Sequence, residues 1–260
     1  MKLFLRLSYL GTAYNGYQVQ GDQPTVQREL TRACAELFGE RCDIVGCSRT
    51  DSGVHANMFC VTVSRRGSDE LTTTIPPHRI PLALNAHLPD DISVYEAALV
   101  SGGFHPRYDV TCKEYVYRIY NSPVRNPFEL DRAWHYPRQI DACALKNMQI
   151  AAGHFCGTHD FSSFMAQGAT VAHAIRTVSH AYVEKKGDVI EFHVAADGFL
   201  YNMVRIMVGT LIAVAEGKIQ AEQIPSVIEA KDRTRAGMTA PAHGLYLNAV
   251  IYESIPKETL

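Results

Sequence analysis

The amino-acid sequence predicts a protein made of two consecutive α/β halves. Three observations lead to this prediction. Short β-like runs alternate with amphipathic helical stretches, the same alternation starts again after about residue 105, and no low-complexity segment or free linker interrupts the chain. We therefore expect one half over residues 1–104 and a second over residues 105–260. A cleft between two such halves is the usual place for a binding site.

The first half opens with a strand, because apolar and polar residues alternate over Leu3–Gly11. A helical stripe of apolar residues follows, with Thr25 as its expected N-cap and Gly39 as its expected end. The members of this stripe are Val26, Leu30, Ala33, Cys34, Leu37 and Phe38. The other elements expected in this half are strands over Asp43–Cys47, Met58–Ser64 and Ile92–Val100 and a proline-interrupted helix over His78–Pro89.

The second half repeats this cycle. A tyrosine-rich strand is expected over Glu114–Asn121, a helix from Asp141, and a β-hairpin that turns at Lys186-Gly187-Asp188. A strongly apolar helix follows, and the stretch "LYLNAVIY" is expected to close the chain as a strand. The apolar face of that helix consists of Leu200, Met203, Val204, Met207, Val208, Leu211, Ile212 and Ala215, while Asn202, Arg205 and Gly209 share another flank.

The overall composition is that of an ordinary globular protein. The chain has 260 residues, of which 47% are hydrophobic and 20% charged, with a net charge of −2. We expect a cytosolic protein, because the N-terminal stretch is too interrupted for a signal peptide and no apolar run suffices for a membrane span. The 7 cysteines include no C-x-x-C pair, which argues against a disulfide framework or a zinc site.

The stretch "GCSRTDSGVHA" (Gly46–Ala56) places Asp51 on the connection between two expected strands. An aspartate before Ser-Gly often serves only to close its own turn, and this is the structural alternative. Two features favour a chemical role. Arg49 brings a second charged group to the same loop, and two rigid strands hold that loop in place.

Metal-dependent chemistry is the main alternative to this interpretation of Asp51. His55 lies four residues after Asp51, and "GHFCGTHDF" supplies His154, His159 and Asp160. Neither spacing is a known ligand pattern, and H-E-x-x-H, phosphate-binding glycine loops and G-x-S-x-G are absent from the sequence. We therefore expect ordinary hydrogen-bonded histidines rather than metal ligands.

Aromatic and cationic residues interleave on the tyrosine-rich strand. Alternation places Tyr115 and Tyr117 on one face and Tyr120 on the other. The cations Lys113 and Arg118 lie on the same strand. These tyrosines could fill a core or form a platform on which a base stacks. Arg205, inside the apolar helix, could extend its charge toward solvent or pair with a buried carboxylate. We hypothesise that it pairs with Asp51, because a nearby guanidinium keeps a carboxylate ionised.

The opening motif and six further segments resemble the tRNA pseudouridine synthase A family. The motif matches the family signature R-T-D-x-G-V-H-A, and the other segments keep the family order along nearly the whole chain. They are "LNAHLPDDISV", "FHPRYDVTCKEYVYRIYN", "HDFSSF", "GFLYNMVRIMVGTL", "KDRTRAG" and "GLYL". The chain departs from the family near its N-terminus, where Leu10 replaces an acidic residue and Tyr17 a tryptophan, while Gln18 and Gln20 remain.

The resemblance implies isomerisation of uridine to pseudouridine at nucleotides 38, 39 and 40 of the tRNA anticodon stem-loop. It also implies a homodimer, no metal or organic cofactor, and the α+β pseudouridine synthase fold. In this fold a mixed, mainly antiparallel sheet is flanked by helices and built as two ferredoxin-like halves around a cleft. Asp51 would be the catalytic carboxylate, attacking C1′ or C6 or removing the 2′ proton; all three paths stay open.

The resemblance further implies roles for residues around Asp51. Tyr115 would stack on the flipped uracil, Leu245 would line the base pocket and Arg49 would contact RNA near the vacated position. Gln18 is a further candidate for binding RNA, and the candidates for phosphate contacts are Arg107, Lys113 and the stretch "KDRTR". The alternatives are a non-catalytic RNA-binding module, a metal-dependent hydrolase, and a synthase of the same family with other RNA targets.

Overall fold

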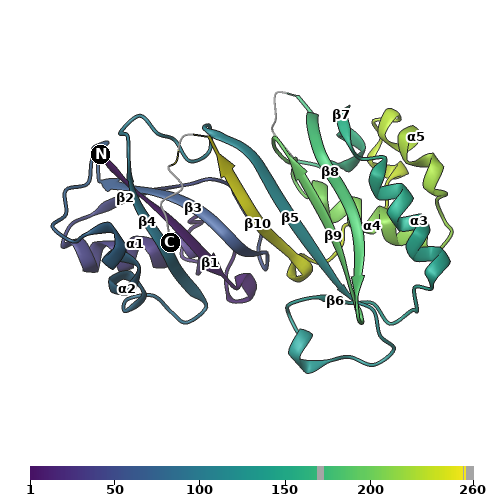
Figure 1. Ribbon diagram of the computed structural model, residues 1–260, viewed down its shortest axis with the longest axis horizontal. Helices are drawn as coiled ribbons and strands as arrows, with labels where there is room; N and C mark the ends of the chain where they lie inside the picture. The colour runs from purple at the N-terminus through teal and green to yellow at the C-terminus, as the bar shows by residue number, and fades with distance from the viewer. Residues whose placement is uncertain (169–172, 254, 256–260) are drawn as a thin grey trace. The chain divides into compact units, whose positions relative to one another are not determined.

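The computed structural model describes residues 1–168, 173–253 and 255. Ten strands form a mixed, mainly antiparallel sheet with helices beside it (Figure 1). This confirms the predicted α+β class. The chain divides into two compact units. The first unit combines Met1–Thr111 with the segment that begins at Leu247, and the second unit is Cys112–Tyr246.

The first unit contains the strand order β4-β1-β3-β10, with β2 paired to β3. Antiparallel pairing sets Leu5 of β1 opposite Val61 of β3 and Ala97 of β4. The core of this unit includes Leu3, Leu5 and Leu7, all fully buried. The strands are β1 (Lys2–Tyr9), β2 (Cys42–Gly46), β3 (His55–Arg65), β4 (Ile92–Val100) and β10 (Leu245–Tyr252), and the helices are α1 (Val26–Phe38) and α2 (Ile80–Asn85).

Helix α1 forms as its sequence predicts. The Thr25 hydroxyl accepts a hydrogen bond from the backbone N–H of Arg28, and Gly39 ends the helix in a left-handed conformation with φ 68°. Helix α2 is shorter than predicted. A 3₁₀ turn over Pro77–Arg79 precedes it, because proline fits the first turn of a helix and not its interior.

The second unit contains the strand order β5-β9-β8-β7, with β6 paired in parallel to β5. The predicted hairpin is confirmed, since β8 and β9 pair antiparallel on either side of residues 187 and 188. Helices α3 and α4 contact each other, and α3 also contacts β8. The elements are β5 (Val110–Tyr120), β6 (Trp134–His135), β7 (Gly157–Asp160), β8 (Ile175–Lys186), β9 (Val189–Ala196), α3 (Ala142–Gly153), α4 (Met203–Ala215) and α5 (Ile224–Glu229).

Short 3₁₀ turns complete the described part of the chain. Besides η2 (Pro77–Arg79), these are η1 (Gly11–Ala13), η3 (Pro127–Glu129), η4 (Ser162–Phe164), η5 (Ala221–Gln223), η6 (Arg233–Arg235) and η7 (Ala242–Gly244). No helix in the described ranges combines the length and the hydropathy that crossing a membrane would require.

The boundary between the units lies at residues 111 and 112, whereas the sequence placed it at 104 and 105. The last strand accounts for a second difference. It pairs with β3, and from Leu247 on it belongs to the first unit. This pairing joins residues far apart in the chain, so a reading of consecutive elements does not reveal it.

Helix α4 packs tightly against the segment that follows η6. A Cβ atom added to Gly209 would lie 1.8 Å from the backbone oxygen of Met238, and one added to Gly237 would lie 2.4 Å from the backbone of Gly209. The Gly237 N–H donates a hydrogen bond of 2.9 Å to the Thr210 hydroxyl. Two glycines thus allow helix and loop backbones to touch one turn away from Arg205.

We expect Gly209→Ala to lower the free energy of unfolding by about 2 kcal/mol or more, since the added methyl group forces the two backbones apart. Urea denaturation measures this change. The matched control is Gly153→Ala at the end of α3, where an added Cβ meets nothing within 4 Å. This control should be neutral or stabilise the protein by up to about 1 kcal/mol. Equal effects of both substitutions would contradict the packing argument.

Candidate active site

The loop that carries Asp51 connects β2 to β3 within the first unit. Its turn is closed by the backbone, because the Val54 N–H donates to the Asp51 carbonyl oxygen at 3.2 Å and Gly53 adopts φ 77°. The backbone amide of Cys47 also donates to the carbonyl of Cys60 at 2.9 Å. These backbone hydrogen bonds are sufficient to close the turn. Asp51 is partly exposed.

The N-terminal loop after β1 holds this Asp51 loop from one side. The Tyr9 and Thr50 hydroxyl groups, both buried, share a hydrogen bond of 2.8 Å. The backbone N–H of Tyr17 donates to the Thr50 carbonyl at 3.2 Å, and that of Gly53 donates to the Tyr14 carbonyl at 3.4 Å. Hydrogen bonds to the N-terminal loop therefore hold the chain just before Asp51, at Thr50, and just after it, at Gly53.

Two glycines permit this close approach. Gly16 adopts φ 80°, and a Cβ atom there would lie 2.4 Å from the Thr50 carbonyl oxygen. A Cβ atom on Gly11 would lie 2.0 Å from the Val54 carbonyl oxygen. Any side chain at these positions would displace the Asp51 loop. These supporting residues were not predicted from the sequence, although the glycines of "YLGTAYNGY" were a usable signal.

His55 supports the same loop contact. It is fully buried, and the backbone N–H of Gly11 donates to its Nδ1 atom at 2.9 Å. An Nδ1 atom that accepts a hydrogen bond leaves the ring proton on Nε2, so the ring is neutral. This confirms that His55 is a hydrogen-bonded structural histidine.

The remaining candidates of the first unit lie on its surface. Arg49 and Gln18 are exposed, and Arg107 is partly buried. Tyr17, at the position where the family has tryptophan, is buried and stacks on Phe59 with 4.3 Å between ring centroids. Burial raises the pKa of Tyr17 well above its usual value, and the nearby charge of Arg107 opposes this shift. Tyr17 therefore packs in the core, while Gln18 beside it faces solvent.

Tyr115 and Lys113 lie on β5. Tyr115 pairs with Val194 and Tyr117 with Phe192, so both tyrosine rings lie on one face of the sheet as predicted. Tyr117 is fully buried and its hydroxyl donates to the Pro241 carbonyl at 2.8 Å, which makes it a core residue. The Tyr115 ring meets the Phe199 ring edge-on at 4.9 Å. Of these two tyrosines, Tyr115 is therefore the candidate for stacking on a base.

Arg205 lies on α4 and is partly buried. Its Nε donates to the Ala240 carbonyl, and a terminal nitrogen donates to the Asn202 side-chain oxygen, each at 2.7 Å. The Ala240 N–H in turn donates to the Arg205 carbonyl at 3.0 Å. These bonds orient the guanidinium rigidly. Burial lowers the pKa of neighbouring His243, and the charge of Arg205 lowers it further, against an opposing effect of Asp131.

Leu245 begins β10 and is buried. The preceding Gly244 lies against Tyr117, since an added Cβ would be 2.7 Å from that ring. This contact between Gly244 and the Tyr117 ring fixes the start of β10, and with it the position of Leu245, within the second unit. Asp51 belongs to the first unit, whereas Arg205 and Tyr115 belong to the second.

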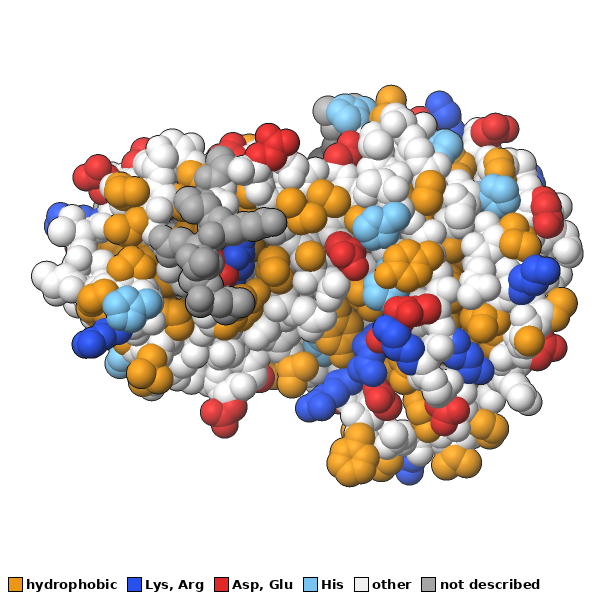
Figure 2. All heavy atoms as spheres, in the orientation of Figure 1, with side chains coloured by type: hydrophobic (Ala, Val, Ile, Leu, Met, Phe, Trp, Pro, Cys, Tyr) orange, Lys and Arg blue, Asp and Glu red, His pale blue; other side chains and the backbone are white. Residues whose placement is uncertain are grey.

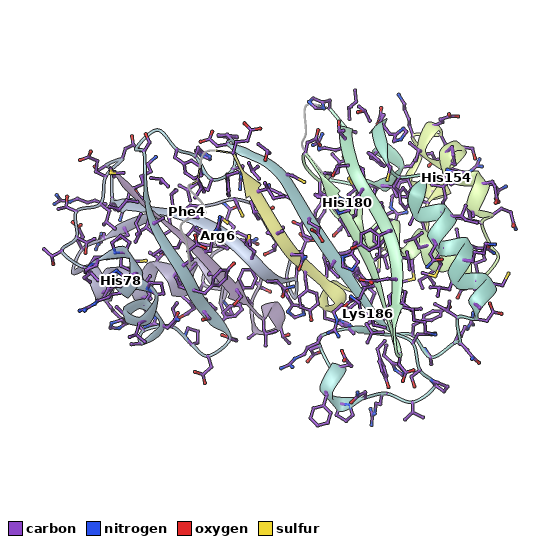
Figure 3. All side chains as sticks on the ribbon, viewed as in Figure 1. Phe4, Arg6, His78, His154, His180 and Lys186 are labelled. Atoms are coloured by element: carbon purple, nitrogen blue, oxygen red, sulfur yellow. The ribbon has the colours of Figure 1, made fainter. Side chains whose placement is uncertain are left out.

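The histidine cluster weighed as a metal site has other partners. His159 Nε2 hydrogen-bonds the Cys156 carbonyl at 2.9 Å, and Asp160 accepts from the Ser162 hydroxyl at 2.6 Å and pairs with Lys231 at 3.0 Å. Figure 3 shows His154 beside α3. Each of these contacts matches the expectation of ordinary hydrogen-bonded side chains.

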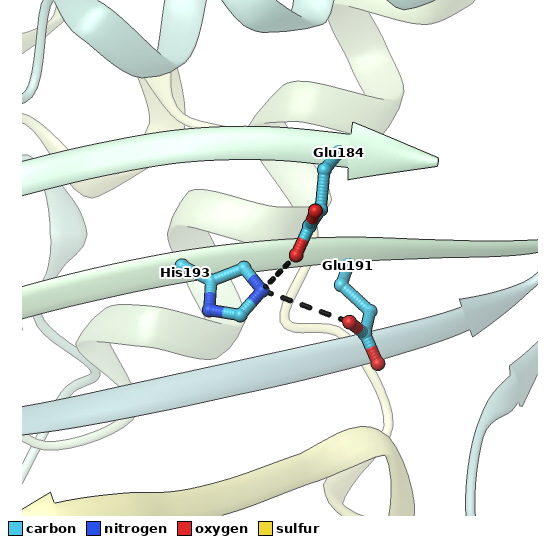
Figure 4. A group of neighbouring side chains, drawn as sticks. All are labelled: Glu184, Glu191 and His193. Atoms are coloured by element: carbon cyan, nitrogen blue, oxygen red, sulfur yellow. Dashed lines mark ion pairs between the residues drawn. The ribbon is translucent and has the colours of Figure 1, made fainter. Parts of the chain in front are cut away.

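A different group, Glu184, Glu191 and His193, could share an ion within the described ranges (Figure 4). His193 Nε2 lies 3.0 Å from Glu184 and 3.7 Å from Glu191. The Lys186 ammonium already lies 2.7 Å from Glu184 and 3.1 Å from Glu191. An ion would have to displace this lysine, so we interpret the group as an ion-pair network on the sheet.

The family of the chain follows from comparison with known proteins. A sequence model described as tRNA pseudouridine synthase matches residues 7–109 and 151–253. The chain belongs to this family. It is 44% identical over 248 residues to the tRNA pseudouridine synthase A of Acetivibrio thermocellus, covering 95% of this chain and 98% of that protein. The protein of the same name from Bacillus subtilis is 41% identical over 256 residues, covering 98% and 100%.

Family membership confirms the resemblance recognised in the seven segments and the enzyme class, a pseudouridine synthase. Both matched ranges include candidate residues. Asp51 and Arg107 fall in the first range, and Arg205 and Leu245 in the second. The loop between β5 and β6 lies outside them.

We expect Tyr9→Phe to lower the free energy of unfolding by about 1–3 kcal/mol, because the buried Thr50 hydroxyl loses its partner. Chemical denaturation of Tyr9→Phe, Thr50→Val and the double variant gives the coupling energy of the pair. Tyr95→Phe on β4, where the ring is 46% exposed, is the matched control and should be neutral. Strictly additive effects of the two substitutions would contradict the bond.

Proposed function

We propose that the protein isomerises uridine to pseudouridine at nucleotides 38, 39 and 40 of the tRNA anticodon stem-loop, with Asp51 as the catalytic carboxylate. The observation that carries this proposal is the loop Arg49-Thr50-Asp51, held on both sides by the N-terminal loop in a chain that belongs to the tRNA pseudouridine synthase family. A carboxylate on a rigid loop suits a reaction that needs one acidic group at a defined position.

The reaction breaks the N1–C1′ bond and joins C5 to C1′. C5 gives up its proton to solvent and N1 takes one up, so every heavy atom stays within one nucleotide. It needs no oxidant, no water and no energy source, and we expect no cofactor or metal. Asp51 would attack C1′ or C6, or remove the 2′ proton. Each of these paths requires the ionised carboxylate.

A paired uridine must leave its stack before it reacts, which costs a few kcal/mol. We propose that Tyr115 stacks on the extruded uracil and that Leu245 supplies an apolar wall. The edge-on contact with Phe199 at 4.9 Å supports this role, because it holds the Tyr115 ring in place. Tyr115 is 7% and Leu245 6% exposed, so the base would meet the small surface that each leaves open. Stacking on one aromatic ring returns about 1–3 kcal/mol.

Arg205 would keep the Asp51 carboxylate ionised. The bonds from its guanidinium to Ala240 and Asn202 support this proposal, because they fix the direction of the charge. Arg49 and Gln18 are exposed and would bind RNA beside the target nucleotide, while Arg107 and Lys113 would bind phosphates. We further propose that the protein works in the cytoplasm as a homodimer.

Two alternatives remain as competing hypotheses. A synthase of the same family with other RNA targets would isomerise uridine elsewhere. A non-catalytic RNA-binding module would bind tRNA without turnover, but Asp51, Tyr115 and Arg205 are all present, which favours catalysis.

We expect Asp51→Ala to abolish tritium release from tRNA labelled at uridine C5, because C5 loses its hydrogen only when it bonds to C1′. Binding of tRNA should persist. Asp22→Ala, at an exposed aspartate of the same unit, is the control and should release tritium at the normal rate. Release at that rate by the Asp51 variant would refute its assignment. Substrates with a single uridine at position 38, 39 or 40 test the target nucleotides.

We expect Arg205→Ala to reduce turnover at least about 100-fold, the order lost with one electrostatic contact to a reacting group. Arg205→Lys should recover part of the turnover, since a lysine keeps the charge without the planar geometry. Thermal unfolding of both variants separates this effect from the loss of the bond to Ala240. Near-wild-type turnover of Arg205→Ala would contradict the proposed link to Asp51.

A further inference from the structure

The loop between β5 and β6, residues 122–132, exposes an unusual amount of apolar surface. Val124 is 72% exposed, Phe128 is 86% exposed and Leu130 is 69% exposed. Phe128 is the most exposed large hydrophobic residue in the described ranges. Exposed apolar side chains grouped on one element indicate an interaction surface, because water alone does not favour such an arrangement.

Internal hydrogen bonds give this loop a defined shape. The Asn126 side-chain oxygen accepts from the Phe128 N–H at 3.0 Å, at the start of the 3₁₀ turn η3. At its base, the Asn121 side-chain amide donates to the carbonyls of Tyr136 and Arg138 at 2.9 and 2.7 Å. Asp131 holds a left-handed backbone with φ 56°. Phe128 is thus held in an exposed position by a folded loop.

The loop carries two arginines and two acidic residues, and its arginines are open to an anionic partner. Arg125 and Arg132 are exposed, and neither forms an ion pair with another described residue. Glu129 pairs with Arg118 at 3.2 Å, and Asp131 lies close enough to His243 to influence its pKa. Figure 2 shows Lys and Arg side chains, with Asp and Glu side chains among them, where this loop leaves the sheet, and hydrophobic side chains beyond them.

The loop is attached beside the residue proposed to line the base pocket. The Tyr246 hydroxyl donates to the Arg132 carbonyl at 2.7 Å, and Tyr246 follows Leu245 directly in β10. Successive side chains of a strand point to opposite faces, so RNA whose uracil contacts Leu245 would pass the start of β10 to bring its neighbouring nucleotides to this loop. An exposed aromatic ring beside cations is the usual arrangement for binding unpaired nucleotides.

We propose that residues 122–132 form a second RNA-contact surface for the tRNA substrate. Phe128 stacks on an unpaired base, and Arg125 and Arg132 contact phosphates on either side of it. This inference rests on the proposed function, because the bound RNA is the substrate of the Asp51 site.

Fluorescence anisotropy with a labelled tRNA transcript tests the proposal on the full-length Asp51→Ala protein, so that no turnover occurs. We expect Phe128→Ala to weaken binding about tenfold, the loss for one base stack, and Phe128→Trp to preserve it. Arg125→Ala and Arg132→Ala should each reduce the slope of log affinity against log salt by about one. Leu82→Ala on α2, where the side chain is 80% exposed, is the matched control and should bind normally.

Two results would overturn the proposal. One is wild-type affinity of Phe128→Ala. The other is a change in oligomeric state of Phe128→Ala in sedimentation, which would show that a second copy of the chain covers this surface. The outcome is separable from the proposed function, because binding is read without turnover, while tritium release by the wild-type protein tests turnover alone.

Discussion

The contact between the N-terminal loop and the Asp51 loop is the constraint on which the first unit's site depends. A hydroxyl pair between Tyr9 and Thr50 and backbone bonds around it fix the residue directly before Asp51. Gly11 and Gly16 make this possible, because any larger residue would collide with the carbonyls of Val54 and Thr50. A reactive carboxylate needs such support, since an error of about an ångström in its position costs much of the rate.

The second unit uses the same physical solution in another setting. Gly209 and Gly237 bring α4 against the loop that follows η6, and the backbone of Ala240 then bonds both the carbonyl and the guanidinium of Arg205. Gly244 lies against Tyr117 immediately before Leu245. In both units a glycine at a close backbone contact lies near a proposed site residue, so the positions of these side chains follow from backbone packing. The charges are also arranged locally. The net charge of the chain is −2, yet Arg125 and Arg132 lie exposed on one loop, while Lys186 forms ion pairs with Glu184 and Glu191 on the sheet.

Sequence patterns predicted the features that depend on neighbouring residues. The N-cap Thr25, the end of α1 at Gly39, the turn at residues 187 and 188 and the shared face of Tyr115 and Tyr117 all follow from spacing of a few positions. The range predicted for helix α2, His78–Pro89, was too long. The helix spans Ile80–Asn85, because proline fits only the first turn of a helix. The Asp51 motif was recognisable because its residues are consecutive, whereas Tyr9, Gly11 and Gly16 support it from 35 or more positions away.

By itself the sequence determined the family, the fold class, most elements and the residues to consider for catalysis, because each depends on local order in the chain. Only the tertiary structure decided that the last strand joins the first unit, that Tyr17 and Tyr117 are core residues, and that Phe128 projects from a folded loop. The physical reason is that burial and strand pairing are set by segments distant in the chain, and the hydropathy of a single residue does not reveal which distant surface will cover it.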